Sequence, residues 1–565
     1  MIILSITNHS ESSASIYDTK SKALLAASEE RFTRIKNSSG IPHRTINFLL
    51  SELNISLSKV DKIIYCSHES IYPSKKLQKQ IDNELKNLND YDKKVFKHRY
   101  DTEVKFNKKS INKFRKWCAK KKVKKNKVFY LDHHEAHARS AIITQKKTKG
   151  YILTCDGKGG FTSSSIWYFN NKNIKCLTRN TSFNSLGYLY GNVTIGLGYK
   201  AERHEGKLTG LSAHGNSEKK IGFTKIFKVR GDKIVARNIR NNYIPFFLKG
   251  KNNWDMGSFF KDMKKYSKEN ISSTVQNVLE KILIEYINKN IPKKSNLLLS
   301  GGIFANVKLN QKLKEINKNR YLFVTPPMSD FGLCLGGLHK YSISKKVRIK
   351  NMYLGPEFSD ITIKKFIKKN KKLSYFQIHD DKKLTKYMID QFKKKKIIAI
   401  FNGKMEFGPR SLCNRSIIFP ATKKSINKIV NKRLNRSDFM PFAPVLIDRF
   451  AKRNFKNYKN HDDLAKFMTV TYECNGKFTK KYPAAVHVDK TARPQILHKN
   501  ENNWFYKILD NYEKFTKEEC LMNTSFNSHE EPIICNPQDA INSLLKKSVD
   551  YVIFNKSIIV SKING

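Results

Sequence analysis

Long hydrophobic runs are missing from this 565-residue chain. Apolar segments such as residues 297–299 and 397–401 are far shorter than the ~20 residues that a membrane-spanning helix needs. Residues 1–5 form an apolar segment with no basic residues ahead of it, unlike a signal or transit peptide. We therefore expect a cytoplasmic protein with no membrane partner.

Paired cysteines are also lacking. The nine cysteines are scattered along the chain, and none belongs to a C-x-x-C pair that could bind zinc. A disulfide framework is not expected in so long a chain without a secretory signal, and the odd number weakens the case further. We interpret the cysteines as buried or incidental thiols.

Acidic residues are few, with 48 Asp and Glu against 108 Lys and Arg and a formal net charge of +60. That charge alone would suggest a nucleic-acid-binding protein. Lysine supplies most of it and is spread over the whole chain, which is typical of a solvated surface. The densest stretch, residues 105–127, contains Phe106, Phe114 and Trp117, which could stack on bases or pack inward from an amphipathic helix. We favour the helix, with local attraction for phosphates, and expect no nucleic-acid partner.

Two segments of the chain share one plan. Residues 1–19 predict an apolar strand, a polar tip at 8–11 and a serine-rich strand, and residues 151–169 repeat this order with a glycine-rich tip at 156–160. Glycine at such a tip lets backbone amides converge on an anion. Because the two hairpins match, they predict a duplicated α/β domain of the actin and sugar-kinase type, the ASKHA architecture.

Glycine pairs mark further turns. Residues 296–306 predict a strand that ends in Gly301-Gly302 and leads through Asn306 into a helix, the layout that places a nucleotide phosphate at a helix N-terminus. The pattern changes near residue 350, so we expect one domain over 1–350 and a second α/β domain over 351–565. In the second domain we expect helices over 384–392 and 504–512 and strands over 396–401 and 519–522.

A histidine cluster is the sharpest local signal in the first half. His133 and His137 are four positions apart, so on a helix they share one face and can bind one metal ion. Asp156 and Asp330, each beside glycine in a turn, are candidates for the remaining ligands. This donor set suits Fe(II), Mn(II) or Zn(II). For any single histidine, helix capping or burial in a core remains the alternative.

Cations gather in the second half around a Gly-Pro bend. Lys404, Arg410 and Arg415 lie within twelve positions. Guanidinium groups bind phosphate oxygens in a bidentate manner. A surface cluster is the alternative, but arginine is scarce relative to lysine in this chain, which favours a specific role.

With these motifs in place, the chain resembles the NodU/CmcH/TobZ family of carbamoyltransferases along its whole length. The resemblance rests on the number, order and spacing of the motifs rather than on any one of them. They are residues 27–36, 133–137, 205–211, 299–306, the turn at Asp330, residues 405–410, 436–444, 486–489 with Arg493, and 523–527.

The resemblance implies an enzyme with two sites. The C-terminal domain would be YrdC-like and would form carbamoyl-adenylate from carbamoyl phosphate and ATP, with release of pyrophosphate. The N-terminal domain, similar to tRNA threonylcarbamoyl-transfer proteins, would pass the carbamoyl group to a hydroxyl of a sugar or secondary metabolite. ATP with Mg(II), carbamoyl phosphate and a divalent metal, Fe(II) first among the candidates, are the implied cofactors and cosubstrates.

The resemblance also assigns roles to residues. His133, His137 and Asp330 match metal ligands, with Asp156 at or near the metal, and Lys36 matches a carbamoyl-adenylate contact. The remaining candidates for nucleotide and carbamoyl phosphate binding are Gly301, Gly302, Asn306, Lys404, Arg410, Arg415, Arg493, Asn523 and Ser525.

We take His9 as the base for the acceptor hydroxyl and count Asp156 as a second catalytic candidate. Ser10 follows His9 where the family usually has Asp, which bears on acceptor recognition.

Three alternatives stay open. The chain could be a tRNA threonylcarbamoyl-transfer-type enzyme, a sugar-kinase-like ATPase, or a catalytically silent basic scaffold or nucleic-acid binder. No sequence motif identifies the acceptor, although we expect residues 66–125 and 170–260 to select it. A homodimer is compatible with the sequence, which neither requires nor excludes it.

Overall fold

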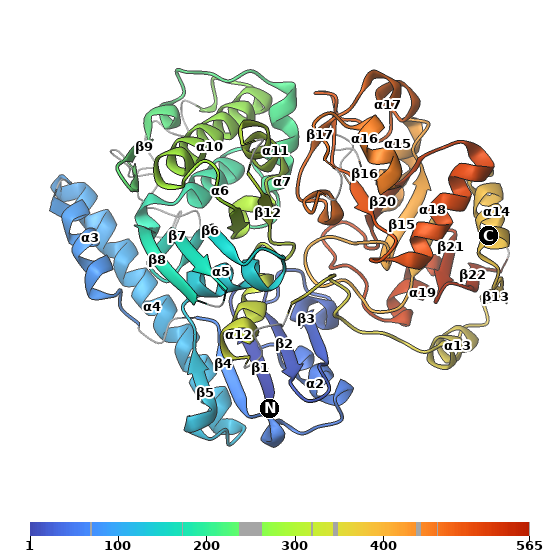
Figure 1. Ribbon diagram of the computed structural model, residues 1–565, viewed down its shortest axis with the longest axis horizontal. Helices are drawn as coiled ribbons and strands as arrows, with labels where there is room; N and C mark the ends of the chain where they lie inside the picture. The colour runs from blue at the N-terminus through green and yellow to red at the C-terminus, as the bar shows by residue number, and fades with distance from the viewer. Residues whose placement is uncertain are drawn as a thin grey trace. The chain divides into compact units, whose positions relative to one another are not determined.

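A computed structural model describes the chain except residues 68–70, 87, 172, 237–262, 318–319, 343–347, 437–441, 460–461 and 564–565 (Figure 1). The described residues form two compact units. The first contains Met1–Leu24, Ser39–His43 and Leu50–Ile349, and the second contains Leu25–Ser38, Arg44–Leu49 and Lys350–Gly565.

The first unit contains two sheets with one topology. In one, β1 (Ile2–Thr7) is antiparallel to β2 (Ser13–Asp18) and parallel to β4 (Lys62–Tyr65), which is followed by β5 (Val128–Tyr130). In the other, β6 (Lys149–Gly159) is antiparallel to β7 (Thr162–Asn170) and parallel to β11 (Leu297–Ser300), which is followed by β12 (Leu322–Val324). The strand β8 (Asn173–Thr181) extends the second sheet beside β7. The repeated order confirms the duplicated actin/sugar-kinase-like architecture.

Two helices connect these sheets. Helix α12 (Leu333–Tyr341) packs on β1 and β2, helix α5 (His133–Ile143) packs on β6 and β11, and the two helices pack on each other. Their approach is close, because a Cβ added at Gly336 would lie 2.1 Å from the carbonyl oxygen of Ala136. The other helices of this unit include α6 (Leu186–Gly196), α7 (Glu205–Leu211), α10 (Lys268–Asn290) and α11 (Val307–Ile316).

A helical hairpin is inserted between β4 and β5. It consists of α3 (Lys75–Lys86) and the 31-residue α4 (Asp90–Lys120), and in Figure 1 both lie at the edge of the first unit. Phe96 of α4 stacks on Phe183, with ring centroids 3.7 Å apart. Phe114 and Trp117 are buried as predicted, whereas the prediction for Phe106 was wrong because its side chain remains 44% exposed.

The second unit is built on a mixed sheet of eight strands in the order β13-β22-β21-β14-β15-β20-β16-β19. Its strands are β13 (Leu373–Gln377), β14 (Ile398–Phe401), β15 (Arg415–Pro420), β16 (Ala443–Ile447), β19 (Gln495–Leu497), β20 (Cys520–Ser525), β21 (Tyr551–Phe554) and β22 (Ile558–Lys562). Its helices include α13 (Asp360–Lys368), α14 (Asp381–Lys393), α15 (Ser425–Arg433), α16 (Asp448–Asn454), α18 (Asn503–Thr516) and α19 (Pro537–Leu545). The four predicted elements of this half correspond to α14, β14, α18 and β20.

A segment from the N-terminal part of the chain belongs to this second unit. It contains most of β3 (Leu24–Ser28) and all of α1 (Glu29–Thr33). Arg31 donates to the carbonyl of Gly408 at 2.8 Å, and Arg34 donates to the carbonyls of Pro532 and Ile533 at 2.9 and 2.8 Å. The arginines of the 27–36 motif therefore support loops of the C-terminal half.

The nine cysteines are all free thiols, as expected from their spacing. Among the described residues, no helix is both long enough and apolar enough to cross a membrane.

The contact between α5 and α12 generates a test of the fold. Gly336→Ala forces a methyl group against the backbone of α5, and we expect a loss of about 2 kcal/mol of stability, seen as a lower Tm. Gly206→Ala in α7 is the matched control, because an added Cβ there meets no atom within 4 Å. Its Tm should stay equal or rise, since alanine favours a helix over glycine. Equal Tm losses in the two variants would contradict the close packing.

Candidate metal centre and anion site

The metal-ligand candidates begin at the N-terminus of α5. Asp132 caps this helix by accepting from the backbone N–H of Glu135 at 2.8 Å, and Arg179 donates to both carboxylate oxygens of Asp132 at 2.9 and 3.1 Å. The cap fixes where the helix starts. His133 is then the first helical residue and His137 lies one turn later on the same face.

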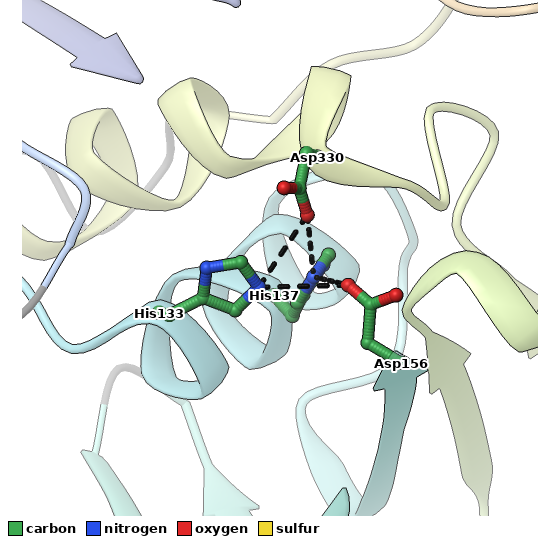
Figure 2. A group of neighbouring side chains, drawn as sticks. All are labelled: His133, His137, Asp156 and Asp330. Atoms are coloured by element: carbon green, nitrogen blue, oxygen red, sulfur yellow. Dashed lines mark hydrogen bonds and ion pairs between the residues drawn. The ribbon is translucent and has the colours of Figure 1, made fainter. Parts of the chain in front are cut away.

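Four side chains converge at this point, as Figure 2 shows. His137 Nε2 lies 3.2 Å from Asp156 Oδ2 and 3.5 Å from Asp330 Oδ1, and His133 Nε2 lies 3.5 and 3.4 Å from the same oxygens. Asp156 lies near the end of β6, and Asp330 begins the 3-10 turn Asp330–Gly332. All four ligand atoms lie within 4.8 Å of one another. The structure thus brings together the four residues that the sequence nominated from three separate segments.

The two carboxylates of this group differ in their electrostatics. Burial raises the pKa of Asp330 well above its ordinary value, and the neighbouring Asp156 adds to this effect. Burial opposes ionisation of Asp156 too, but the neighbouring His133 and His137 outweigh it and hold the pKa of Asp156 well below its usual range. Two carboxylates this close cannot both be ionised unless positive charge lies between them.

The donor set fits a divalent cation. His133 Nε2 and Asp330 Oδ1 are buried, and neither has a hydrogen-bond partner in the described part of the chain. Such atoms carry a desolvation cost that coordination would remove. Two imidazole nitrogens and two carboxylate oxygens suit Fe(II), Mn(II) or Zn(II) and do not select among them.

The third histidine of the cluster has a different role. His134 is fully buried, with Nδ1 2.8 Å from Thr154 Oγ1 and Nε2 3.0 Å from the carbonyl of Thr162. Burial lowers the pKa of His134 well below its ordinary value, so it is neutral near pH 7. It anchors α5 to the second sheet and does not point to the metal-ligand candidates.

Glycines shape the walls of the cluster. A Cβ added at Gly159 would lie 2.2 Å from His133 Cδ2, and one added at Gly302 would lie 2.9 Å from Asp156 Oδ1. Gly301 has φ +108° and would place a Cβ 2.2 Å from the carbonyl oxygen of Cys155. The strand-Gly-Gly turn therefore lies directly beside Asp156.

His9, the predicted base, lies next to the metal-ligand candidates. Its ring meets the ring of His133 edge-on with centroids 5.3 Å apart, and its Nε2 lies 3.2 Å from Ser67 Oγ. On the other side it stacks with Phe106 of α4, whose ring has Lys158 Nζ 4.4 Å from its centre. Helix α4 is thus part of this site.

Sequence reasoning missed Phe106, Lys158, Gly159 and Glu202. Burial raises the pKa of Glu202, and the charge of Asp156 raises it further, so Glu202 belongs to the electrostatic surroundings of the cluster. Its backbone has φ +62°, a left-handed conformation unusual for glutamate. The glycine-rich tip at 156–160 was a usable signal for Gly159 and Lys158, but no local pattern pointed to Glu202.

The side chain of Asn306 forms hydrogen bonds to neighbouring residues of the protein. Its side chain accepts from the N–H of Leu309 at 3.0 Å as the cap of α11, and it donates to Gln276 at 2.7 Å. Lys36 lies just after α1, in the segment that belongs to the second unit.

Half-buried arginines mark a second site, in the second unit. Burial lowers the pKa of Arg410 to about 10, and burial together with the charge of Arg410 lowers the pKa of Arg493 well below its ordinary value. The two guanidiniums therefore lie close enough together for the charge of one to act on the other. Arg410 Nε is buried without a hydrogen-bond partner in the described chain.

A third arginine of the second unit, Arg436, was not among the predicted site residues. It donates to Thr524 Oγ1 at 2.6 Å, Ser525 Oγ at 3.2 Å and Asn527 Oδ1 at 2.9 Å, and burial lowers its pKa to about 10. Asn523, in the same strand, donates to Gln495 at 2.6 Å. Within the described residues, Arg410, Arg436 and Arg493 form no ion pair with a carboxylate.

Arg415 is placed differently from Arg410. It is fully buried, lies over the ring of Phe401 and donates to the backbone carbonyls of Pro356, Asn402, Gly403 and Asn414 at 2.9 to 3.2 Å. The guanidinium therefore binds the backbone of the loop.

Glu406 completes the same loop. Its carboxylate accepts from the N–H groups of Leu412, Asn414 and Arg415 at 2.6, 2.7 and 3.0 Å. Arg415 and Glu406 together fix the chain on both sides of Arg410.

Lys404 is exposed and lines a separate cavity of about 880 Å³. Polar residues dominate its walls, among them Asn402, Asn414, Glu501 and Asn555, and Trp504 is also part of its lining. Arg410, Arg493 and Ser525 are not part of this lining.

Comparison with known families decides the affiliation. A family model described as carbamoyltransferase N-terminus matches residues 3–338, and one described as carbamoyltransferase C-terminus matches residues 389–562. The chain belongs to the carbamoyltransferase family. It is therefore a transferase, and both its N-terminal and its C-terminal half match a model of the family.

Relatives cover nearly the full length of this carbamoyltransferase. The uncharacterized protein MJ1051 of Methanocaldococcus jannaschii is 30% identical over 99% of each chain. The nodulation protein NolNO of Sinorhizobium fredii is 26% identical over 95% of this chain and 77% of its own. Among solved structures, the activator of 2-hydroxyisocaproyl-CoA dehydratase from Clostridium difficile matches 60% of this chain and 93% of its own, with 11% identity and a TM-score of 0.34.

The contact between Gly159 and His133 leads to a prediction about metal binding. Gly159→Ala should displace the His133 ring and weaken Mn(II) or Fe(II) binding about tenfold to a hundredfold, the range seen when the support of a ligand is lost. Equilibrium dialysis with metal analysis measures this. Gly157→Ala is the matched control, because its Cβ makes only ordinary contact with Tyr188 at 3.7 Å. Unchanged binding in Gly159→Ala would show that His133 does not hold the ion.

Proposed function

We propose that this carbamoyltransferase is an ATP-dependent O-carbamoyltransferase acting on a hydroxyl of a small molecule. The second unit activates the carbamoyl group and the His–Asp cluster of the first unit serves its transfer. The observation that carries the proposal is the pair of half-buried arginines Arg410 and Arg493, which lie close enough to affect each other's charge and have no carboxylate partner among the described residues.

Activation needs a site that gathers phosphates. Carbamoyl phosphate gives up phosphate with uptake of water, and a carbamate oxygen then attacks the α-phosphorus of ATP, forming carbamoyl-adenylate and releasing pyrophosphate. Every species in this sequence is an anion. Arg410 and Arg493 repel each other and have lost hydration, so phosphate oxygens between them would replace both the missing water and the missing counter-charge.

Neighbouring side chains can orient the reactants. Arg436 is held by Thr524, Ser525 and Asn527, and these bonds fix its guanidinium plane before any ligand binds. Preorganised donors cost no rearrangement at the moment of reaction, which makes them more effective in catalysis. The Arg415–Glu406 scaffold gives the same rigidity to the loop that carries Arg410.

Transfer takes place at the histidine and aspartate cluster. His133, His137, Asp156 and Asp330 would hold a divalent cation. When bound, it would supply positive charge that offsets the charge of the departing AMP, a contribution of several kcal/mol. The acceptor oxygen attacks the carbamoyl carbon, the bond to the AMP oxygen breaks, and the hydroxyl proton passes to a base.

His9 is the base that the geometry favours. Its ring lies against His133, and its Nε2 is held near Ser67 Oγ while Phe106 covers one side of the ring. A base must lie within hydrogen-bond reach of the reacting hydroxyl. Asp156 would serve the step as a ligand of the cation, with Oδ2 3.2 Å from His137 Nε2.

The arginine group leads to a test of activation. Purified enzyme should release pyrophosphate from ATP only with carbamoyl phosphate present, and Arg410→Ala should lower this rate by about a hundredfold or more. Arg453→Ala is the matched control, because Arg453 is exposed and pairs with Glu519 at the surface. Pyrophosphate release that is equal with and without carbamoyl phosphate would remove the proposed first step.

The metal cluster leads to a separate test of transfer. His133→Ala should keep carbamoyl-phosphate-dependent pyrophosphate release but lose bound metal and the carbamoyl mass gain in a screen of hydroxylated metabolites. His43→Ala, which changes an exposed histidine, should retain all three readouts. If His133→Ala transferred the carbamoyl group at the normal rate, the cluster would have no part in transfer.

A further inference from the structure

Helix α4 presents a cationic face to solvent. Its exposed basic residues are Lys93, Lys94, Lys97, Lys105, Lys108, Lys109, Lys113, Arg115, Lys116 and Lys120. The exposed acidic residues of α4 are Asp90, which pairs with Lys93 at 3.5 Å, and Asp101. The other two acids, Asp92 and Glu103, are buried.

Helix periodicity places these cations on one side. The buried positions Asn107, Ser110, Phe114 and Trp117 recur at intervals of three or four residues and mark the inward face. The Arg99–Glu103 ion pair, at 3.2 Å, belongs to that face. Since a residue adds about 1.5 Å to a helix, the outward row from Lys93 to Lys120 is roughly 40 Å long.

The charge of this segment exceeds what the lysine-rich composition explains. Residues 93–127 hold 16 basic and two acidic residues, a net charge of +14 over 35 residues, whereas the whole chain has +60 over 565. The density of positive charge is thus about four times the chain average. Repulsion among the like charges of α4 and of the lysines that follow it is unfavourable, so a partner with negative charge would relieve it.

The chemistry of the face favours a diffuse anionic surface over nucleic acid. All its exposed cations except Arg115 are lysines, which lack the planar fork that reads base edges. Its exposed aromatic residue, Phe106, already has Lys158 over its ring and His9 stacked against it. An anionic membrane requires only charge within a Debye length, to which each lysine contributes independently.

We propose that the outward face of α4 docks this carbamoyltransferase on an anionic lipid bilayer. The contact is peripheral, since no described helix can span a membrane, and it departs from the expectation of no membrane partner. Phe106 lies at the edge of the face and touches His9, so docking would place the transfer site near lipid headgroups. If the proposed function holds, the acceptor hydroxyl belongs to a molecule carried at the membrane.

Vesicle sedimentation tests the docking. The full chain should sediment with vesicles of equal parts phosphatidylglycerol and phosphatidylcholine at low salt, and not with pure phosphatidylcholine or at high salt. A sixfold variant with Lys94, Lys97, Lys105, Lys109, Lys113 and Lys116 changed to Gln should bind at least about tenfold more weakly. An unchanged Tm and unchanged carbamoyl-phosphate-dependent pyrophosphate release show that this variant is folded.

A matched variant separates the face of α4 from total charge. It changes six exposed lysines around α13 and α14 to Gln and should retain most of the binding; these are Lys365, Lys368, Lys369, Lys371, Lys372 and Lys382. Equal losses in the two variants, or no sedimentation of the unmodified chain, would overturn the proposal.

Competition with DNA in the vesicle assay tests for a nucleic acid partner. If a random-sequence DNA duplex removes the protein from vesicles, and duplex binding is lost only in the α4 variant, the face binds nucleic acid instead and the proposal fails. Vesicle binding is measured without turnover, so it stands or falls independently of the pyrophosphate assay that tests the proposed function.

Discussion

The first unit depends on one electrostatic constraint, which is that two carboxylates and two imidazoles are buried within a few ångströms of one another. Without a cation, Asp156 and Asp330 compete for protons and His133 leaves a nitrogen unsatisfied. The surrounding structure accepts this cost: the Asp132 cap fixes the start of α5, and Gly159 leaves room for the His133 ring. A fold selected for stability alone would have filled this space with apolar side chains.

The second unit encloses positive rather than negative charge, and the same desolvation cost applies to it. Here the buried charges are guanidiniums, and the protein supplies amides, hydroxyls and backbone carbonyls rather than carboxylates around them. Arg415 shows how a buried guanidinium is satisfied when it serves the scaffold, since four carbonyls receive its protons. Arg410 lies five positions earlier and keeps Nε unsatisfied in the described chain. The contrast separates an arginine that builds the loop from one that is ready for a ligand.

Sequence reasoning could find whatever repeats or recurs at a fixed spacing. The hairpins at 1–19 and 151–169 predicted the duplicated fold, and the interval between His133 and His137 predicted a shared helix face. It could not find residues whose role depends on distant packing. Glu202 and Arg436 lie in no pattern of their own, and the support that Arg31 gives to Gly408 spans 377 positions of chain. Phe106 was expected on the buried face of α4. Its side chain instead stays 44% exposed, and its ring stacks with the ring of His9.

Composition and position carry different information in a chain this basic. Lysine dominates the total charge, yet the cations that matter for phosphate chemistry in the proposed activation site are half-buried arginines. A lysine at those positions would lose its proton more readily on burial, since its ordinary pKa is lower, and it could not bind two oxygens of one phosphate. Lysine instead serves at the surface of α4, where each charge stays hydrated and acts from a distance. The cations of this chain therefore serve two proposed functions. The partly dehydrated arginines bind phosphates, and the hydrated lysines of α4 attract an anionic surface.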